Sequence, residues 1–172
     1  PNSIYFIGDH AFQKCEKLVS ISLPPISSIK DFTFNDCFSL EKIFIPFTIN
    51  EIGCYSFGNC SSLKIVNIPT SVVSIKDFAF YGCSQLSDIS IPPTLTSIGN
   101  NAFSKCSSLS LIAIPSLVES IGKSAFDGCS SLNRCLLKST LKLIQYKLFY
   151  NCSSLSQITI PPSVTSIDDY AF

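Results

Sequence analysis

The stretch AFYGCSQLSDISIPPTLTSIGNNAFSKCSSLSLIAIP, residues 79–115, contains one pattern twice. Phe80 returns as Phe103 and Cys83 returns as Cys106, in each case 23 residues later. A fixed interval of this length is typical of repeat proteins, in which each unit buries its apolar faces against the next one. The fold therefore depends on whether the interval extends through the rest of the chain.

The interval extends from one end of the sequence to the other. A phenylalanine stands three residues before each repeated cysteine, and a leucine stands three residues after it. The repeated cysteines are Cys15, Cys37, Cys60, Cys83, Cys106, Cys129 and Cys152. We therefore divide the chain into repeat units that all begin with proline except one. These units are 1–23, 24–45, 46–68, 69–91, 92–114, 115–137 and 138–160, followed by a half unit, 161–172.

The composition is that of a folded protein without a strong electrostatic preference. Hydrophobic residues make up 46% of the 172 residues and charged residues 14%, which excludes disorder. Twelve basic and twelve acidic residues cancel without forming runs, so nucleic acid is not an expected partner. No apolar stretch approaches the roughly 18 residues of a membrane span, so we expect no membrane insertion of this segment. The chain begins at Pro1 and contains no Met, which indicates a fragment of a longer chain.

Each unit combines two periodicities. Between Ile98 and Leu109 the apolar residues are spaced by four, four and three, which is typical of one face of a helix. Ile112 and Ile114 then alternate with other residues, as in a short strand, and Pro115 ends that strand. A single unit would leave two apolar faces in water, so the units must stack. The sequence predicts a repeat solenoid with a curved parallel β-sheet on its concave side and short helical turns on its convex side.

Residues 109–129, LSLIAIPSLVESIGKSAFDGC, match the pattern L-x-x-I-x-I-P-x-x-V-x-x-I-x-x-x-A-F-x-x-C position by position. This pattern resembles the BspA-like leucine-rich repeat, and the resemblance covers the whole chain. Unit 138–160 departs from it, because Lys138 replaces proline and Leu148 replaces alanine, and Cys135 stands in the strand before it. The resemblance implies a solenoid of the leucine-rich-repeat type at the cell surface or outside the cell. It further implies adhesion to a protein of the host cell surface or the extracellular matrix, with glycan as another ligand.

Two other functions remain open. The solenoid could be a structural spacer that extends another domain. It could also be an intracellular protein-interaction scaffold, which unpaired thiols would favour. Because neither end has a polar capping unit, end-to-end self-association of the fragment is also expected.

The repeated cysteines admit packing, disulfide, metal and nucleophile interpretations. Packing is favoured, since free cysteine is among the most buried residue types and no C-x-x-C pair is present. We expect Cys54, in a variable position, to be the thiol that meets solvent. Its column contains Asp31, Asp77 and Asn100, which we interpret as helix caps rather than as a row of calcium ligands. His10 is the sole histidine, so we expect no catalytic site, metal or cofactor.

The residues that flank the inward-facing isoleucine of each strand should face outward from the concave sheet. Contiguous apolar side chains in such positions often mark interaction sites. Candidate partner-binding residues on this face are Lys42, Phe44, Ile65, Asn67, Asp88, Leu111, Ala113, Arg134 and Leu136. Two N-x-S sequons make Asn59 and Asn151 candidate glycosylation sites.

Overall fold

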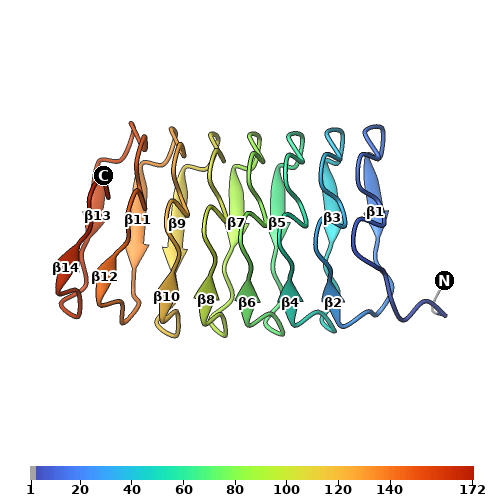
Figure 1. The fold of residues 1–172 in the computed structure, drawn as a ribbon, viewed down its shortest axis with the longest axis horizontal. Coiled ribbons are helices and arrows are strands. Elements are labelled where there is room, and N and C mark those ends of the chain that lie inside the picture. The colour runs from blue at the N-terminus through green and yellow to red at the C-terminus, as the bar shows by residue number, and fades with distance from the viewer. Residues whose placement is uncertain (1–2) are drawn as a thin grey trace.

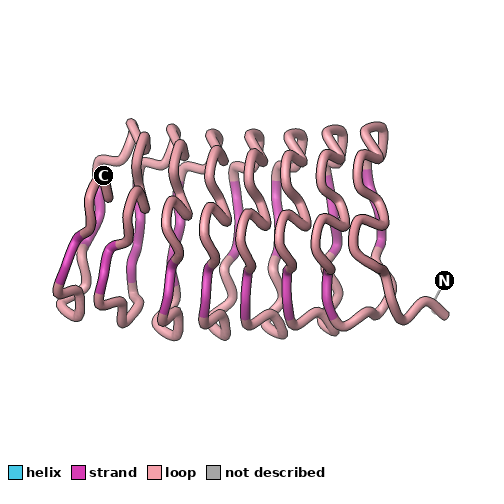
Figure 2. The backbone as a smooth tube through the Cα atoms, in the orientation of Figure 1, coloured by secondary structure: helices cyan, strands magenta, loops and turns pink. Residues whose placement is uncertain are grey.

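The chain winds into a solenoid whose coils stack along one axis, with the N-terminus at one end and the C-terminus at the other (Figure 1). The structure is a computed structural model, and it describes residues 3–172. Each coil contributes one strand of three or four residues and one strand of two residues, so two rows of parallel strands run the length of the stack (Figure 2). The predicted solenoid is therefore confirmed, with a second row of strands that the sequence did not indicate.

The odd-numbered strands form the row in which the binding residues were expected. Their bounds are β1 (Ser20–Ser22), β3 (Lys42–Phe44), β5 (Ile65–Asn67), β7 (Asp88–Ser90), β9 (Leu111–Ile114), β11 (Arg134–Leu137) and β13 (Gln157–Thr159). They pair in register, so that Ile65 lies opposite Asp88 and Leu111 opposite Arg134. The backbone ladder is interrupted between β3 and β5 and between β7 and β9.

The even-numbered strands form the second row. Their bounds are β2 (Ser28–Ile29), β4 (Glu51–Ile52), β6 (Ser74–Ile75), β8 (Ser97–Ile98), β10 (Ser120–Ile121), β12 (Leu143–Ile144) and β14 (Ser166–Ile167). The ladder runs unbroken from β2 to β10, and β12 pairs with β14. Every paired isoleucine from Ile29 to Ile121 is buried and belongs to the hydrophobic core.

The expected helical turns are not present: residues 3–172 contain no helix, and this part of the prediction was wrong. Each coil instead has two residues with left-handed backbone. One stands five residues before the repeated cysteine and the other directly before it, as Asn101 (φ 52°) and Lys105 (φ 63°) do before Cys106. A helix cannot pass through isolated left-handed residues. The segment therefore forms consecutive tight turns, in which Ser104 N–H donates to Asn101 O and Cys106 N–H donates to Phe103 O.

The left-handed residues also direct alternate N–H groups toward the next coil. Asn101 N–H donates to Lys123 O (2.9 Å), Phe103 N–H to Ala125 O (2.8 Å) and Lys105 N–H to Asp127 O (2.7 Å). From Asn101 to Cys106, three N–H groups thus donate to the next coil and two donate within the same coil. This arrangement keeps backbone polar groups paired where a helix would have placed all bonds within one coil.

A column of phenylalanines forms the centre of the core. The rings from Phe12 to Phe172 stack in parallel along the axis, with centroids 5.1–5.7 Å apart. The rings from Phe34 to Phe149 are fully buried. Offset parallel stacking is a favourable geometry for aromatic pairs. The repeated phenylalanine therefore joins neighbouring coils as well as filling each of them.

Candidate binding surface

The outer face of the odd-numbered strands carries the residues that the sequence singled out. All of them are exposed except Leu136, which is half-buried. The exposed fraction is 62% for Phe44, 53% for Ile65 and 49% for Leu111, although these side chains lie in interior coils. We call the outer residues of strands β3 to β13 the strand face. The structure thus places the candidates on one surface, while their role in binding stays a prediction.

Charges alternate along this face. One column of outward positions reads Lys42, Ile65, Asp88, Leu111 and Arg134 from β3 to β11. Within residues 3–172 the ion pairs are Lys64 with Glu41 (3.7 Å) and Lys76 with Glu51 (2.9 Å), so none of the three charges in this column is neutralised by a partner. Both neighbours of this stretch, Ser20 on β1 and Gln157 on β13, are uncharged.

Three shallow hollows open on the strand face. One of about 300 Å³, between β3 and β5, is lined by Lys42, Ile65 and Asn67 together with the ion pair of Glu41 and Lys64. The next, of about 490 Å³, lies between β7 and β9 and is lined by residues that include Asp88 and Leu111. The third, of about 380 Å³, lies between β11 and β13 beside Arg134. Each of these hollows therefore lies beside one of the three charges of the column.

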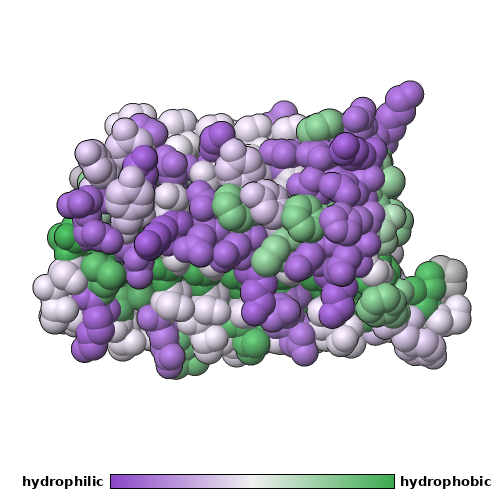
Figure 3. Space-filling view, in the orientation of Figure 1, coloured by the Kyte–Doolittle hydropathy of each residue, from purple (hydrophilic) through white to green (hydrophobic). Residues whose placement is uncertain are grey.

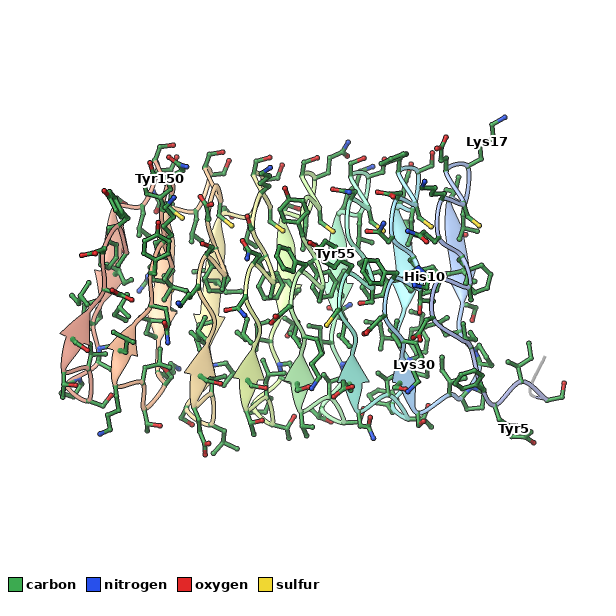
Figure 4. The ribbon with its side chains drawn as sticks, viewed as in Figure 1. Tyr5, His10, Lys17, Lys30, Tyr55 and Tyr150 are labelled. Carbon is green, nitrogen blue, oxygen red and sulfur yellow. The ribbon has the colours of Figure 1, made fainter. Side chains whose placement is uncertain are left out.

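The repeated thiols from Cys37 to Cys152 are packed, and they are also hydrogen-bond donors. Cys106 Sγ–H donates to the carbonyl of Phe80 (3.2 Å), 26 residues earlier, and the same bond recurs in the coils from Cys37 to Cys152. All nine cysteines are free, as the packing interpretation requires. Sulfur atoms recur from coil to coil in Figure 4. The sequence indicated burial but not this ladder of thiol–carbonyl bonds.

Burial keeps the interior thiols protonated. It raises the pKa of Cys135 and of Cys152 to about 12, and that of Cys37 to about 11. A thiol of such high pKa is protonated at neutral pH, and the thiolate is the nucleophilic form. The expectation that Cys54 is the one thiol in contact with solvent was wrong: Cys15 in the first coil is exposed, and Cys54 is half-buried.

The Asp and Asn column joins coils and does not cap helices, so that interpretation was wrong. Asp77 Oδ1 accepts the N–H of Asn100 (2.7 Å), and Asn100 Oδ1 accepts the N–H of Lys123 (2.9 Å). Asp31 does the same for Cys54 (2.7 Å). Each carboxylate or amide thus satisfies a donor one coil further along. In the described part of the chain, no three His, Cys, Asp or Glu side chains gather closely enough to hold a metal ion.

A second aromatic row, on the turn side, was missed. His10, Phe32, Tyr55 and Phe78 stack in parallel with centroids 4.4–5.0 Å apart. Figure 4 labels His10 and Tyr55 in this row. An aromatic residue five positions before the cysteine in each of the first four units was the available signal. The face visible in Figure 3 carries many hydrophilic side chains, with hydrophobic ones among them.

The two sequon asparagines differ in accessibility. Asn151 is exposed and its Nδ2 donates to Asp127 Oδ1 (3.3 Å), whereas Asn59 is half-buried and its Nδ2 donates to Asp36 Oδ1 (2.9 Å). If either is modified, Asn151 is the more accessible site, and its glycosylation stays a prediction. Residues 3–172 form no helix, and hence none that could span a membrane.

Solved structures with similar folds place the chain in a known class. A leucine-rich repeat protein of T. pallidum is 29% identical with a TM-score of 0.83, over 87% of this chain and 72% of that one. One from Bacteroides ovatus is 21% identical with a TM-score of 0.54, over 95% and 66%. The pneumococcal vaccine antigen PcpA is 19% identical with a TM-score of 0.56, over 89% and 40%. A comparison with curated proteins finds no match.

The stacked coils and their parallel strands are those of a leucine-rich-repeat solenoid. A profile of the BspA type leucine rich repeat region, in six copies, matches residues 1–109 and 50–172. The chain therefore belongs to the BspA-type leucine-rich repeat family, as the resemblance of its repeats indicated.

Proposed function

We propose that this solenoid is a non-catalytic interaction module that binds a protein partner through the strand face. The observation that carries the proposal is the exposure of Phe44, Ile65 and Leu111 on the row of odd-numbered strands. Exposed apolar side chains that cluster beside polar groups favour protein association. The protonated state of the buried thiols and the lack of a second histidine favour a non-catalytic role.

Adhesion at a cell surface is the setting that we propose for this binding. BspA-like repeats resemble surface proteins, and one similar structure is described as a vaccine antigen. The partner would then be a protein of the host cell surface or of the extracellular matrix, with glycan as a further ligand. A second candidate, an intracellular scaffold, is favoured by the nine free thiols, since reducing compartments keep cysteines unpaired.

The test compares binding of the wild type and of a Phe44→Asp/Ile65→Asp variant to immobilised matrix proteins and to whole epithelial cells. A matched control, Val73→Asp/Leu117→Asp, changes two side chains of similar exposure that lie outside the odd-numbered strands. Circular dichroism checks that all three proteins are folded. The proposal expects saturable binding that the strand-face variant loses and the control keeps. Equal binding by both variants, or none by the wild type, would refute it.

A further inference from the structure

The alternating charges on the strand face define the shape of the partner. Lys42, Asp88 and Arg134 are each separated by two strand steps. Paired neighbouring strands lie about 4.8 Å apart, and two of the four steps between Lys42 and Arg134 lack the ladder, so charges of opposite sign recur roughly every 10 Å. Apolar side chains, Ile65 and Leu111, lie midway between them. A complementary partner must therefore present acidic, apolar, basic, apolar and acidic groups in a line across the strands.

An α-helix provides this spacing. Its residues rise about 1.5 Å each, so positions seven apart are about 10.5 Å apart on one face, with a further position midway, at three or four. The small excess over two strand steps is absorbed when the helix inclines to the stack axis. An extended peptide fits less well, because its side chains on one face recur about every 6.6 Å, out of step with both one and two strand spacings.

Each of the three charges lines a hollow. Lys42 lines the one between β3 and β5, Asp88 the one between β7 and β9, and Arg134 the one between β11 and β13. Large side chains seven residues apart on a helix could enter successive hollows. Ser20 and Gln157 bound the charged stretch, which limits the matched length to about four helical turns.

We infer that the strand face docks an amphipathic α-helix of a protein partner, laid along the solenoid axis, with acidic residues opposite Lys42 and Arg134 and a basic residue opposite Asp88. This inference rests on the proposed function and specifies its partner. Lys42 and Arg134 carry no internal ion pair within residues 3–172, so their charges are available to such a helix.

The test uses designed 18-residue helical peptides and fluorescence anisotropy. The matched peptide carries Glu, Lys and Glu at positions seven apart, with Leu midway between them. The inverted peptide carries Lys, Glu and Lys in the same positions. A third peptide has the matched composition and a central proline, which breaks the helix. The wild type should bind the matched peptide at least tenfold more tightly than either of the other two.

A charge-reversed protein, Lys42→Glu/Asp88→Lys/Arg134→Glu, should reverse this preference by a similar factor. These exposed side chains are outside the core, so the variant should stay folded, as circular dichroism would verify. Equal affinity for the matched and inverted peptides, no binding of either, or no reversal would overturn the helix inference. If the Phe44→Asp/Ile65→Asp variant still loses cell binding in that case, the proposed function stands with a partner of another shape. If the peptides show no preference and the Phe44→Asp/Ile65→Asp variant also binds cells like the wild type, both the helix inference and the proposed function are refuted.

Discussion

Replacing Phe103 by leucine should show how much ring stacking contributes to stability. Phe103 is fully buried between Phe80 (5.4 Å, 3°) and Phe126 (5.5 Å, 3°). An aromatic pair contributes about 0.5–1.5 kcal/mol beyond the area that it buries, so the loss of two pairs should lower the free energy of unfolding by about 1–3 kcal/mol. Phe103→Ala also leaves a cavity, and its cost should rise to about 3–5 kcal/mol.

Urea unfolding followed by circular dichroism measures both changes. Phe172→Leu is the matched control, because Phe172 has one neighbour, Phe149 (5.7 Å, 17°), and is half exposed. Its cost should stay below about 1 kcal/mol, since a single and partly solvated pair is lost. If Phe103→Leu costs no more than Phe172→Leu, the phenylalanine column only fills space, and the argument from stacking fails.

Three further predictions concern the ladders and the turns. Burial raises the pKa of Cys106 in the folded state, so its stabilising contribution is complete below about pH 8.5 and falls as the pH rises. We therefore compare the wild type with Cys106→Ala between pH 8 and 10 under reducing conditions. The unfolding free energy of the wild type should drop by about 1–2 kcal/mol more than that of the variant. Equal drops would contradict this. Asn101 has left-handed backbone, so Asn101→Ala should cost about 1–2 kcal/mol of stability, whereas Asn101→Gly should be nearly neutral. Thermal melts that rank the two variants the other way would exclude backbone strain at this position. Asp77→Ala leaves the Asn100 N–H without its acceptor and should cost about 1–2 kcal/mol of stability in urea titrations. Asp77→Asn should recover part of that loss. An equal cost for both variants would argue against a stabilising role of the Asp and Asn hydrogen bonds between coils.

The interval between repeats was sufficient to predict most of the fold. A 23-residue period with alternating isoleucines before each proline is enough to predict stacked coils and a parallel row, because only stacking buries both faces of a unit. The same alternation places Phe44 and Ile65 on the outer side of their strands, where the structure has them exposed. Outward positions could therefore be read from the sequence, even though their partner could not.

The turns were mispredicted because the spacing of buried residues is the same in two backbones. Ile98, Ala102, Cys106 and Leu109 are all buried, as a helix would require. Left-handed backbone is usually signalled by glycine or asparagine, but here residues such as Phe78 and Lys147 adopt it. Hydrogen bonds to the next coil hold these residues in the left-handed conformation, and no local sequence pattern indicates such bonds.

The ladders were missed for a related reason. An aspartate before a turn is the usual sign of a helix cap, and a buried cysteine is the usual sign of apolar packing. Asp77 meets its donor 23 residues later, and Cys106 meets its acceptor 26 residues earlier. Such pairs depend on the pitch of the whole stack, so they became visible only when neighbouring coils were placed side by side.

The nearest-neighbour ladders make the length of this molecule adjustable in whole coils. Removing residues 92–114, one repeat period, would bring Phe80 next to Phe126 and place the Lys123 N–H at Asp77, so each column keeps a suitable partner. On the strand face the same excision would remove Leu111 and bring Arg134 one step, about 4.8 Å, closer to Lys42. Unequal recombination between repeats can therefore change the spacing of the charged and apolar side chains on the strand face in steps of one coil. The core that supports these side chains stays unchanged.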